Sequence, residues 1–385
     1  MRSPFLRLLT PTTVLTLTLA SLASAAGPHL GDPLPGLAQA ELARFDAGRT
    51  EFLDKDDEAE GLGPVFNFNS CAGCHRSGAI GGAGRKLETR FGRITGGLFD
   101  PMAGSGGSLQ QARALRAICS ETIPPDATIT AQRQTTPLFG LGLVEAIPDA
   151  QIVAVAADQA VTHPASAGRV HYVQSPATND IRVGRFGWKA QQADLLSFSG
   201  DAYLNEMGVT NRLFPIENAP NGDVDLLQIC DTTPDPEDIH DNIDLFTDFM
   251  QFLAPPPRGA IGASELAGEA IATNIGCLDC HRPTYTAVSV VSAIDGQSVH
   301  AYSDFLLHDI ETGDGIVQGD AQGNEIRTAP LWGLRRSGPY LHDGRARRVT
   351  DAIEAHGGQA QAARDAFAQL PSSNRAALLK FLRSL

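Results

Sequence analysis

The chain has 385 residues and a formal net charge of −14, and 42% of its residues are hydrophobic. The length predicts two or three domains, and the apolar content is high enough for a sizeable core, which excludes a wholly disordered protein. The acidity argues against a nucleic-acid-binding protein, which needs a basic surface to meet phosphate. Six cysteines are too few for a disulfide-built scaffold, while 39 glycines and 24 prolines indicate many loops.

The first 25 residues have the layout of a secretion signal. Arg2 and Arg7 give a basic start, 8–22 is mostly apolar, and Ala23-Ser24-Ala25 supplies the small residues that a signal peptidase requires. The apolar run is too short and too interrupted for a membrane anchor. We expect cleavage before Ala26, export to a bacterial periplasm, and no membrane span in the mature chain.

Four of the six cysteines fall in two C-x-x-C-H pentapeptides, 71–75 and 277–281. This is the attachment pattern of c-type haem, because two thiols about one helical turn apart can form thioethers with the two vinyl groups of one porphyrin. The histidine that follows, His75 or His281, then coordinates the iron. A redox dithiol does not require that histidine, and the long gap between the two motifs is unlike a zinc ribbon. The sequence therefore predicts two covalently bound haems, attached through Cys71, Cys74, Cys277 and Cys280.

The remaining cysteines, Cys119 and Cys230, fall in no motif. In an oxidising compartment they could form a disulfide, although the sequence does not show whether their Cα atoms come close. The alternative is two buried cysteines that act as small apolar side chains. Both alternatives stay open at this point.

The two pentapeptides belong to an internal repeat. Each follows a stretch with the apolar spacing of a helix, and each precedes a similar hexapeptide, T-P-L-F-G-L or A-P-L-W-G-L. Each half of the chain then closes with an amphipathic helix. The helical stretches cover 42–52 and 266–275, the hexapeptides 136–141 and 329–334, and the closing helices 243–253 and 376–385.

Ala254 and the three prolines after it form a stiff stop that indicates a domain boundary. Short helices, few strands and many Gly/Pro loops around a haem are typical of cytochrome c. We therefore expect a mainly α fold with two tandem cytochrome c-like domains, 26–254 and 255–385. The first domain is longer and carries loop-rich insertions.

The repeat also contains an asymmetry. Aligning 186–190 with 342–346 places Gly200 in the first half where His356 stands in the second. A histidine at this point can supply the sixth ligand of the second iron, whereas a glycine has no side chain to do so. We therefore expect one closed iron suited to electron transfer and one open iron suited to chemistry.

With these motifs the chain resembles the di-haem oxidoreductase family, often labelled thiol oxidoreductases, which is related to the bacterial di-haem cytochrome c peroxidases. The resemblance runs from about residue 40 to the C-terminus. The segments that carry it are both C-x-x-C-H motifs, 136–147, 185–190, 206–208, 327–334, 340–346 and 356–358.

The resemblance implies that the N-terminal haem reacts with hydrogen peroxide and that the other haem supplies electrons. The acid of the peroxidases is the glutamate of a Glu-Met-Gly triplet, which corresponds here to Glu206 and would move the peroxide proton. Their second haem takes a Met ligand at the position of His356, and imidazole in place of a thioether usually lowers a haem potential. Arg345 is a candidate partner for a haem propionate.

The chain departs from the peroxidases at several positions. The Trp between their haems falls at Phe186, with Trp188 two residues on, and their distal Gln falls at Leu196. Their interdomain calcium uses backbone carbonyls that match near Ser337 and Pro339, but its Asn ligand corresponds to a threonine at 135. Calcium is therefore a candidate cofactor on weaker grounds than haem.

Two classes of function remain open. The first is an enzyme, a periplasmic peroxidase-like oxidoreductase that uses a small oxidant such as hydrogen peroxide and a small electron-donor protein, either a cytochrome or a cupredoxin. The second is an electron carrier in which both irons are six-coordinate. A weaker third possibility, by analogy with a related di-haem enzyme, is oxidation of a protein or thiol. The acidic stretches at 231–244 and 309–314 are best interpreted as solvated loops, which could also attract a basic small cytochrome as donor.

Overall fold

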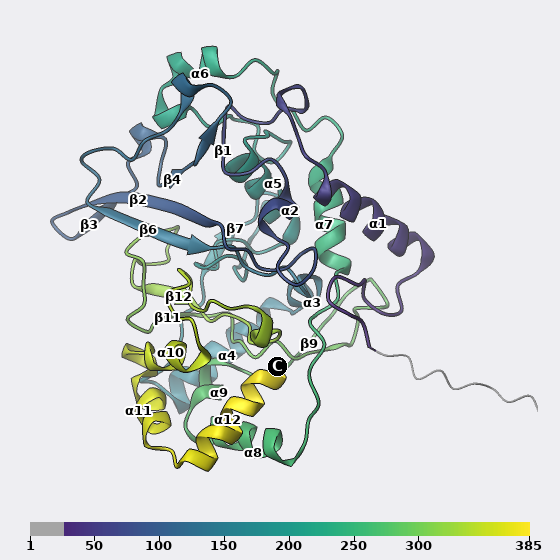
Figure 1. Cartoon of the computed structure of the whole chain (residues 1–385), viewed down its shortest axis with the longest axis vertical. Helices are drawn as coiled ribbons and strands as arrows, with labels where there is room; N and C mark the ends of the chain where they lie inside the picture. Colours follow the sequence, from purple (N-terminus) through teal and green to yellow (C-terminus); the bar gives the residue numbers. More distant parts are fainter. Residues whose placement is uncertain (1–26) are drawn as a thin grey trace, which may run out of the picture.

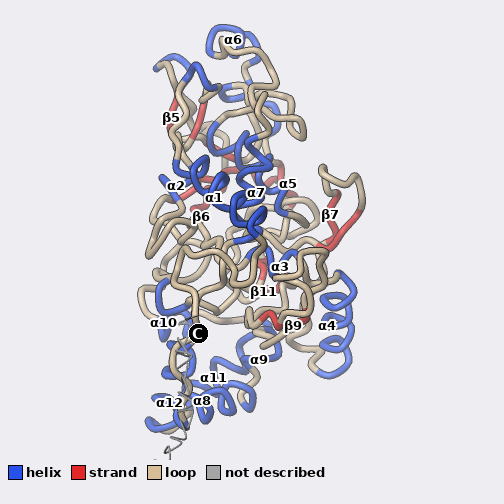
Figure 2. The backbone as a smooth tube through the Cα atoms, turned by 90° about the vertical axis from the view of Figure 1, so that its right-hand side faces the viewer, coloured by secondary structure: helices blue, strands red, loops and turns tan. Residues whose placement is uncertain are grey.

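The computed structural model describes residues 27–385, so the predicted signal segment 1–25 lies outside the described residues. Helices outweigh strands, and loops make up much of the path (Figure 2). The helices are α1 Gln39–Leu53, α2 Cys71–Cys74, α3 Leu141–Glu145, α4 Asp149–Thr162, α5 Leu195–Ala202, α6 Val224–Cys230, α7 Asn242–Phe252, α8 Ala263–Asn274, α9 Cys277–Cys280, α10 Val349–Glu354, α11 Gln361–Gln369 and α12 Ser372–Ser384.

The strands are short and form small antiparallel sheets. The largest sheet is built on β2, which pairs with β6 from Leu87 opposite Gln134 to Gly92 opposite Ile129. It belongs to the insertion between the first pentapeptide and the first hexapeptide. The strands are β1 Val65–Phe66, β2 Leu87–Thr95, β3 Leu98–Asp100, β4 Leu109–Gln110, β5 Arg113–Ala114, β6 Ile129–Gln134, β7 Tyr172–Gln174, β8 Ile181–Val183, β9 Tyr285–Thr286, β10 Ser298–Val299, β11 Leu307–Asp309 and β12 Glu325–Arg327.

Two helix pairs display the internal repeat. Helix α1 packs against α7, and α8 packs against α12. A glycine permits each crossing, since a Cβ on Gly48 or Gly268 would collide with a backbone carbonyl of the facing helix. The predicted helices are all present, although α12 begins at Ser372, four residues earlier than expected, directly after Pro371.

The repeated hexapeptides are tied to these helix pairs in the same way. The amide of Gly140 donates to the carbonyl of Leu253, which directly follows α7, at 3.1 Å. The amide of Gly333 donates to the carbonyl of Leu385, which directly follows α12, at 2.9 Å. Both glycines have a positive φ, the left-handed conformation that glycine adopts without steric cost. The sequence repeat is therefore also a repeat of backbone contacts.

The larger hydrophobic core contains residues from both sides of the predicted boundary at residue 254, whereas the smaller core lies entirely after it. The larger core surrounds Phe52, Phe249 and Phe246 but also takes in Phe305 and Trp332 from the C-terminal half. The smaller core, Ala272, Tyr302, Phe367, Leu378, Phe381, Leu382 and Leu385, lies wholly in that half. Helix α4 of the N-terminal half lies beside α9 in the lower part of Figure 1, where Gln159 donates to the carbonyl of Asp279 at 2.7 Å.

Cys119 and Cys230 form a disulfide, with their Cα atoms 6.0 Å apart. Of the two alternatives that the sequence left open, the bridge is the one present. It joins the insertion after β5 to the end of α6, so it closes a loop of 111 residues in the upper part of the molecule. None of the helices within 27–385 has both the length and the apolar character that a membrane crossing requires.

Candidate functional site

The first C-x-x-C-H segment forms the short helix α2, and His75 follows its end. Nδ1 of His75 lies 2.9 Å from the carbonyl oxygen of Thr136, so Nδ1 carries the proton and donates, which leaves Nε2 free. Burial lowers the pKa of His75 to about 4, which keeps the ring neutral, as a metal ligand must be. Thr136 opens the first repeated hexapeptide, so that hexapeptide orients the histidine.

The second segment repeats this arrangement. Helix α9 is followed by His281, whose Nδ1 donates to the carbonyl of Tyr302 at 3.0 Å. The pKa of His281 falls to about 4, first because the ring is buried and second because His356 lies close to it. Each motif histidine therefore offers a neutral ring with a free Nε2.

The second segment opens on a cavity of about 340 Å³. Both thiols, His281 and His356 belong to its wall. His356 comes just after α10, and its Nδ1 donates to the carbonyl of Ala352 at 2.7 Å, so its Nε2 is also free. Burial lowers the pKa of His356. Apolar side chains complete the wall, among them Ile275, Phe305, Trp332, Leu378 and Phe381.

These residues fit the haem that the motif predicts. Two thiols lie one helical turn apart beside a buried imidazole, a second imidazole lines the same cavity, and apolar side chains surround them. In each ring the second nitrogen is held by a backbone carbonyl, which is the usual way in which a protein orients a ligating histidine.

An arginine that the sequence analysis did not select also lines the cavity. Arg327 is buried and donates from Nε to the carbonyl of Gly187 and from Nη1 to that of Thr328, both at 2.8 Å. Burial lowers its pKa to about 10. By contrast Arg345 does not line the cavity, is half-exposed and pairs with Asp343. Because a buried guanidinium with only carbonyl partners favours an added carboxylate, Arg327 is the better candidate for a propionate.

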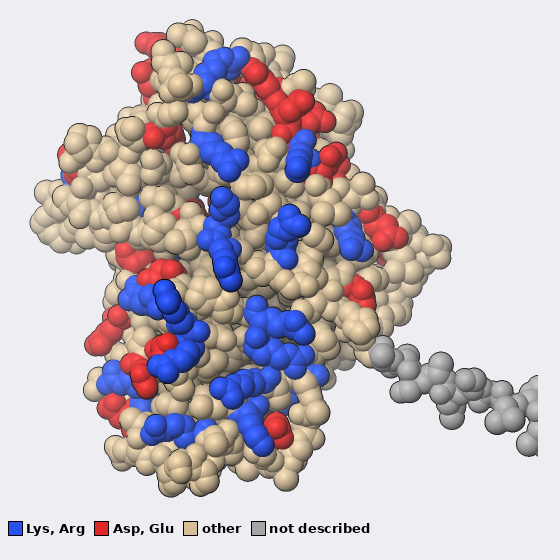
Figure 3. All heavy atoms as spheres, in the orientation of Figure 1, with Lys and Arg blue, Asp and Glu red and all other residues tan. Residues whose placement is uncertain are grey.

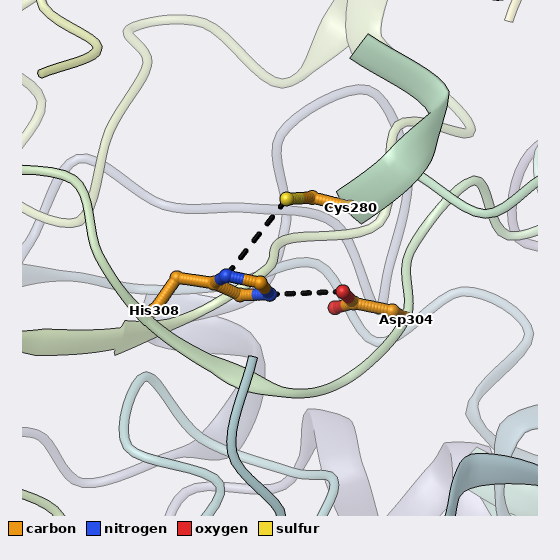
Figure 4. Close-up of side chains that lie close together, drawn as sticks. All are labelled: Cys280, Asp304 and His308. Carbon is orange, nitrogen blue, oxygen red and sulfur yellow. Dashed lines mark hydrogen bonds and ion pairs between the residues drawn. The ribbon is translucent and has the colours of Figure 1, made fainter. Parts of the chain in front are cut away.

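A buried ion pair lies against the second motif (Figure 4). Sγ of Cys280 is 3.8 Å from Nδ1 of His308, whose Nε2 lies 2.9 Å from the carboxylate of Asp304. Burial by itself would lower the pKa of His308, but the Asp304 carboxylate outweighs it and raises the pKa to about 10. Gln159 of α4 donates to the same carboxylate at 2.8 Å. This places a positive charge beside Cys280.

Glu206 lies beside the first motif. It belongs to a π-helical turn, Tyr203–Met207, that follows α5, and such turns are frequent at functional sites. Its carbonyl accepts from the amides of Asn67 and Phe68, and its carboxylate accepts from Nδ2 of Asn67 at 2.8 Å. Burial, and then the charge of Glu88, raise the pKa of Glu206 to about 7. Burial, and then the charge of Glu206, raise the pKa of Cys74 to about 11.

The next residue, Met207, also reaches the first motif, with Sδ 4.0 Å from Sγ of Cys71. Gly200, the counterpart of His356 in the repeat, is buried, and a Cβ there would lie about 3 Å from Asn211 and Phe214. The first motif thus has an acid, Glu206, and a thioether, Met207, near it. The position of Gly200, which corresponds to His356, is closely packed by its neighbours.

The positions that correspond to the Trp and Gln of the peroxidases, Phe186 and Leu196, lie in different surroundings. Phe186 and Trp188 both line the cavity of the second motif, and Nε1 of Trp188 donates to the carbonyl of Gln134 at 2.8 Å. Leu196 packs against the larger core. At the predicted calcium position, the carbonyl of Pro339 accepts from Nε2 of Gln134 at 3.0 Å. Ser337 lines the same cavity, so this position adjoins the second motif.

Comparison with known proteins decides the family. A family model described as "Di-haem oxidoreductase, putative peroxidase" matches residues 110–385. The chain belongs to this family. The resemblance predicted from the motifs is thereby confirmed, and membership implies two haem groups and an oxidoreductase. No curated protein matches the chain.

Several solved structures are similar to this di-haem oxidoreductase. Hydrazine synthase of Kuenenia stuttgartiensis is 14% identical, with 98% of this chain and 100% of that chain covered and a TM-score of 0.43. A MauG-like protein associated with microbial copper homeostasis is 14% identical, with 96% and 95% covered and a TM-score of 0.41. The diheme peroxidase BthA of Burkholderia thailandensis is 14% identical, with 92% and 87% covered and a TM-score of 0.42.

Proposed function

We propose that the chain is an exported, periplasmic di-haem oxidoreductase of the peroxidase kind with two covalently attached c-type haems. The first haem, at Cys71, Cys74 and His75, meets hydrogen peroxide or another small oxidant. The second, at Cys277, Cys280, His281 and His356, supplies electrons to it. The observation that carries the proposal is the position of Glu206 beside the first motif, whereas a second histidine, His356, lines the cavity at the second motif.

At the first site the bound haem would supply a redox-active iron able to take an oxygen ligand. Glu206 would hold and move the proton: with a pKa of about 7 it populates both protonation states near neutral pH, so it can take a proton from one oxygen and give it to the other. Asn67 orients the carboxylate by donating to it. The amides of Asn67 and Phe68 hold the backbone of Glu206 by donating to its carbonyl.

At the second site the imidazoles of His281 and His356 would both hold the haem iron, which would supply electron transfer there. Arg327 would pair with a propionate, and His308 would place a positive charge beside Cys280. We propose that 26–254 and 255–385 are the two haem domains, since each contains one motif, one helix pair and one hexapeptide in equivalent contact.

Calcium at the 135, 337 and 339 position stays part of the proposal.

The electron donor would be a small cytochrome or cupredoxin. Figure 3 shows Lys and Arg side chains gathered over the lower half of the molecule, the region of α8 and α10–α12 in Figure 1. This favours an acidic donor on that face rather than the basic donor expected from the acidic stretches. Comparing reduction rates by an acidic and a basic cupredoxin at low salt tests this.

A second candidate is the electron carrier without substrate chemistry. Its support is Met207, whose thioether reaches the first motif and could act as a sixth ligand there. The test is the spin state of the first haem together with peroxide consumption, measured on the oxidised and the two-electron-reduced protein. A high-spin first haem that consumes peroxide supports the enzyme. A low-spin haem that is inert to peroxide in both states supports the carrier and overturns the peroxidase proposal.

A further inference from the structure

A cluster of three carboxylates lies outside both haem sites. Glu217, Asp235 and Glu237 each bring one oxygen to within 4.8 Å of the other two. All three belong to the connection between the π-helical turn of Glu206 and α7. Glu217 is buried, with 7% of its surface exposed, while Asp235 is exposed. The cluster therefore has a buried floor and an open side.

The hydrogen bonds within the cluster do not supply a partner for every carboxylate oxygen. Oγ1 of Thr210 lies 2.5 Å from Oδ1 of Asp235 and 3.1 Å from Oε2 of Glu237, yet a hydroxyl has one proton to donate. The Thr210 amide donates to Oε2 of Glu237 at 2.8 Å. Oε1 of Glu217 accepts from the amide of Asn218 at 2.5 Å, but its Oε2 is buried without any partner. An unpartnered buried carboxylate oxygen is costly and calls for a positive group.

The charges around the cluster also favour a positive group within it. Burial, and to a smaller extent the neighbouring acids Glu237, Asp235 and Asp231, raise the pKa of Glu217 to about 9. The pKa of Glu237 rises to about 8, mainly through burial and against the Thr210 hydrogen bonds. The neighbouring acids thus act against the ionisation of Glu217 and Glu237, and a bound cation would allow both of these carboxyl groups to ionise.

We propose that Glu217, Asp235 and Glu237 bind a hard divalent cation, with Ca²⁺ as the preferred ion. The available ligand atoms are all oxygens, which Ca²⁺ takes in numbers of six to eight. Three carboxylates supply up to six oxygens, and the exposed side at Asp235 provides an entry path and room for water. Mg²⁺ fits less well because it demands near-ideal octahedral geometry and dehydrates reluctantly. This site is separate from the calcium position predicted at 135, 337 and 339.

The site would stabilise the support of Glu206. Thr210 is four residues after Glu206, and Gly208 between them packs so closely on the carbonyls of Gly63 and Val65 that a Cβ would collide with them. The side chain of Glu237 lies against Gly61 in the same loop. A bound cation would therefore join the 206–210 segment to the loop that leads to the first haem motif. Cation binding itself does not depend on the proposed peroxidase function.

Calcium binding to the chelator-treated holoprotein tests the proposal. Equilibrium dialysis with Ca²⁺ counts bound ions in the wild type, in Glu217→Gln and in Asp235→Asn, whose exposed position protects folding. The matched control is Glu121→Gln, since Glu121 is a partly buried acid of the same half whose oxygens accept from the amides of Gln111 and Asn221. A second binding site elsewhere does not disturb this test, because the difference between variants is counted.

We expect the wild type and Glu121→Gln to bind one more Ca²⁺ per chain than Glu217→Gln and Asp235→Asn. The wild type should also release more protons on binding, which calorimetry in two buffers measures. Equal stoichiometry in all four proteins, or no Ca²⁺ bound by the wild type, would overturn the site. Equal affinity for Mg²⁺ would overturn the assignment of the ion. Peroxide turnover is measured separately, so failure of the peroxidase proposal leaves this result unaffected.

Discussion

The two C-x-x-C-H regions share the same local scaffold and differ in the side chains that lie near it. Both have a four-residue helix that carries the cysteines, a half-buried histidine with Nδ1 bonded to a carbonyl, and a helix pair tied to a hexapeptide glycine. Near the first, the distinctive side chain is the acid Glu206, and near the second it is the imidazole of His356. The repeat therefore accounts for the shared scaffold, and Glu206 and His356 distinguish the two sites.

The two regions also differ in the charges around them, which are mainly acidic near Glu206 and basic near the second motif. The charges that act on Glu206 include Glu88 and Asp201 besides Arg90. The second motif has buried Arg327 lining its cavity and the His308 imidazolium against Cys280. Positive charge favours the reduced form of a nearby redox group and so raises its potential. These residues should therefore offset part of the decrease in the potential of the second haem that is expected from a His356 ligand.

The sharpest test of the comparison is Glu206→Gln. A positioned acid or base contributes about 10²–10⁴-fold to rate, so peroxide turnover should fall by about that factor. Both haem potentials should stay nearly unchanged, because Glu206 is not an iron ligand. Stopped-flow peroxide kinetics and potentiometry measure the two quantities, with Glu121→Gln as the control. If turnover is unchanged while the wild type is active, Glu206 is a structural residue.

The second test converts one region toward the other at His356. His356→Gly should open the second iron and give a high-spin signal, whereas His356→Met should keep it low-spin and raise its potential. Absorption and electron paramagnetic resonance spectra report the spin state, and the first haem acts as the internal reference. Unchanged spectra in both variants would mean that another side chain ligates the second iron.

Local patterns explain what could be predicted from the sequence. The cysteine and histidine spacing and the apolar periodicity placed the two motifs and the helix pairs, and α7 begins and ends one residue from its expected limits. Arg327 and His308 were missed because their surroundings are tertiary: His308 meets a cysteine 28 residues away and Arg327 a carbonyl 140 residues away. The one available signal was the arginine two residues ahead of the second hexapeptide, where the first half has Gln134.

The third test uses pH on the Asp304–His308 pair. The folded pKa of His308 lies at about 10, above its ordinary 6.5, so the stability that the pair contributes is fully present below pH 6.5 and is lost as pH rises toward 10. The loss amounts to at most about 1.4 kcal/mol per pH unit in that window. Denaturant unfolding at pH 7 and pH 10 should show a smaller decrease in His308→Gln than in the wild type. The same decrease in both proteins would show that another group causes it.

The smallest expected effect separates the two arginines near the second haem. Arg327→Gln removes a buried guanidinium from the cavity wall, so it should lower the potential of the second haem on the order of 60 mV, the equivalent of a tenfold change for a one-electron couple. Arg345→Gln is the matched control, because that side chain is half-exposed, pairs with Asp343 and does not line the cavity. The first haem should keep its potential in both variants, since Arg327 donates to Gly187 and Thr328 and lies on the cavity of the second motif. Potentiometry that resolves the two haems measures all three quantities. A larger shift from Arg345→Gln than from Arg327→Gln would restore Arg345 as the propionate partner and would show that half-exposed arginines rearrange when haem is bound.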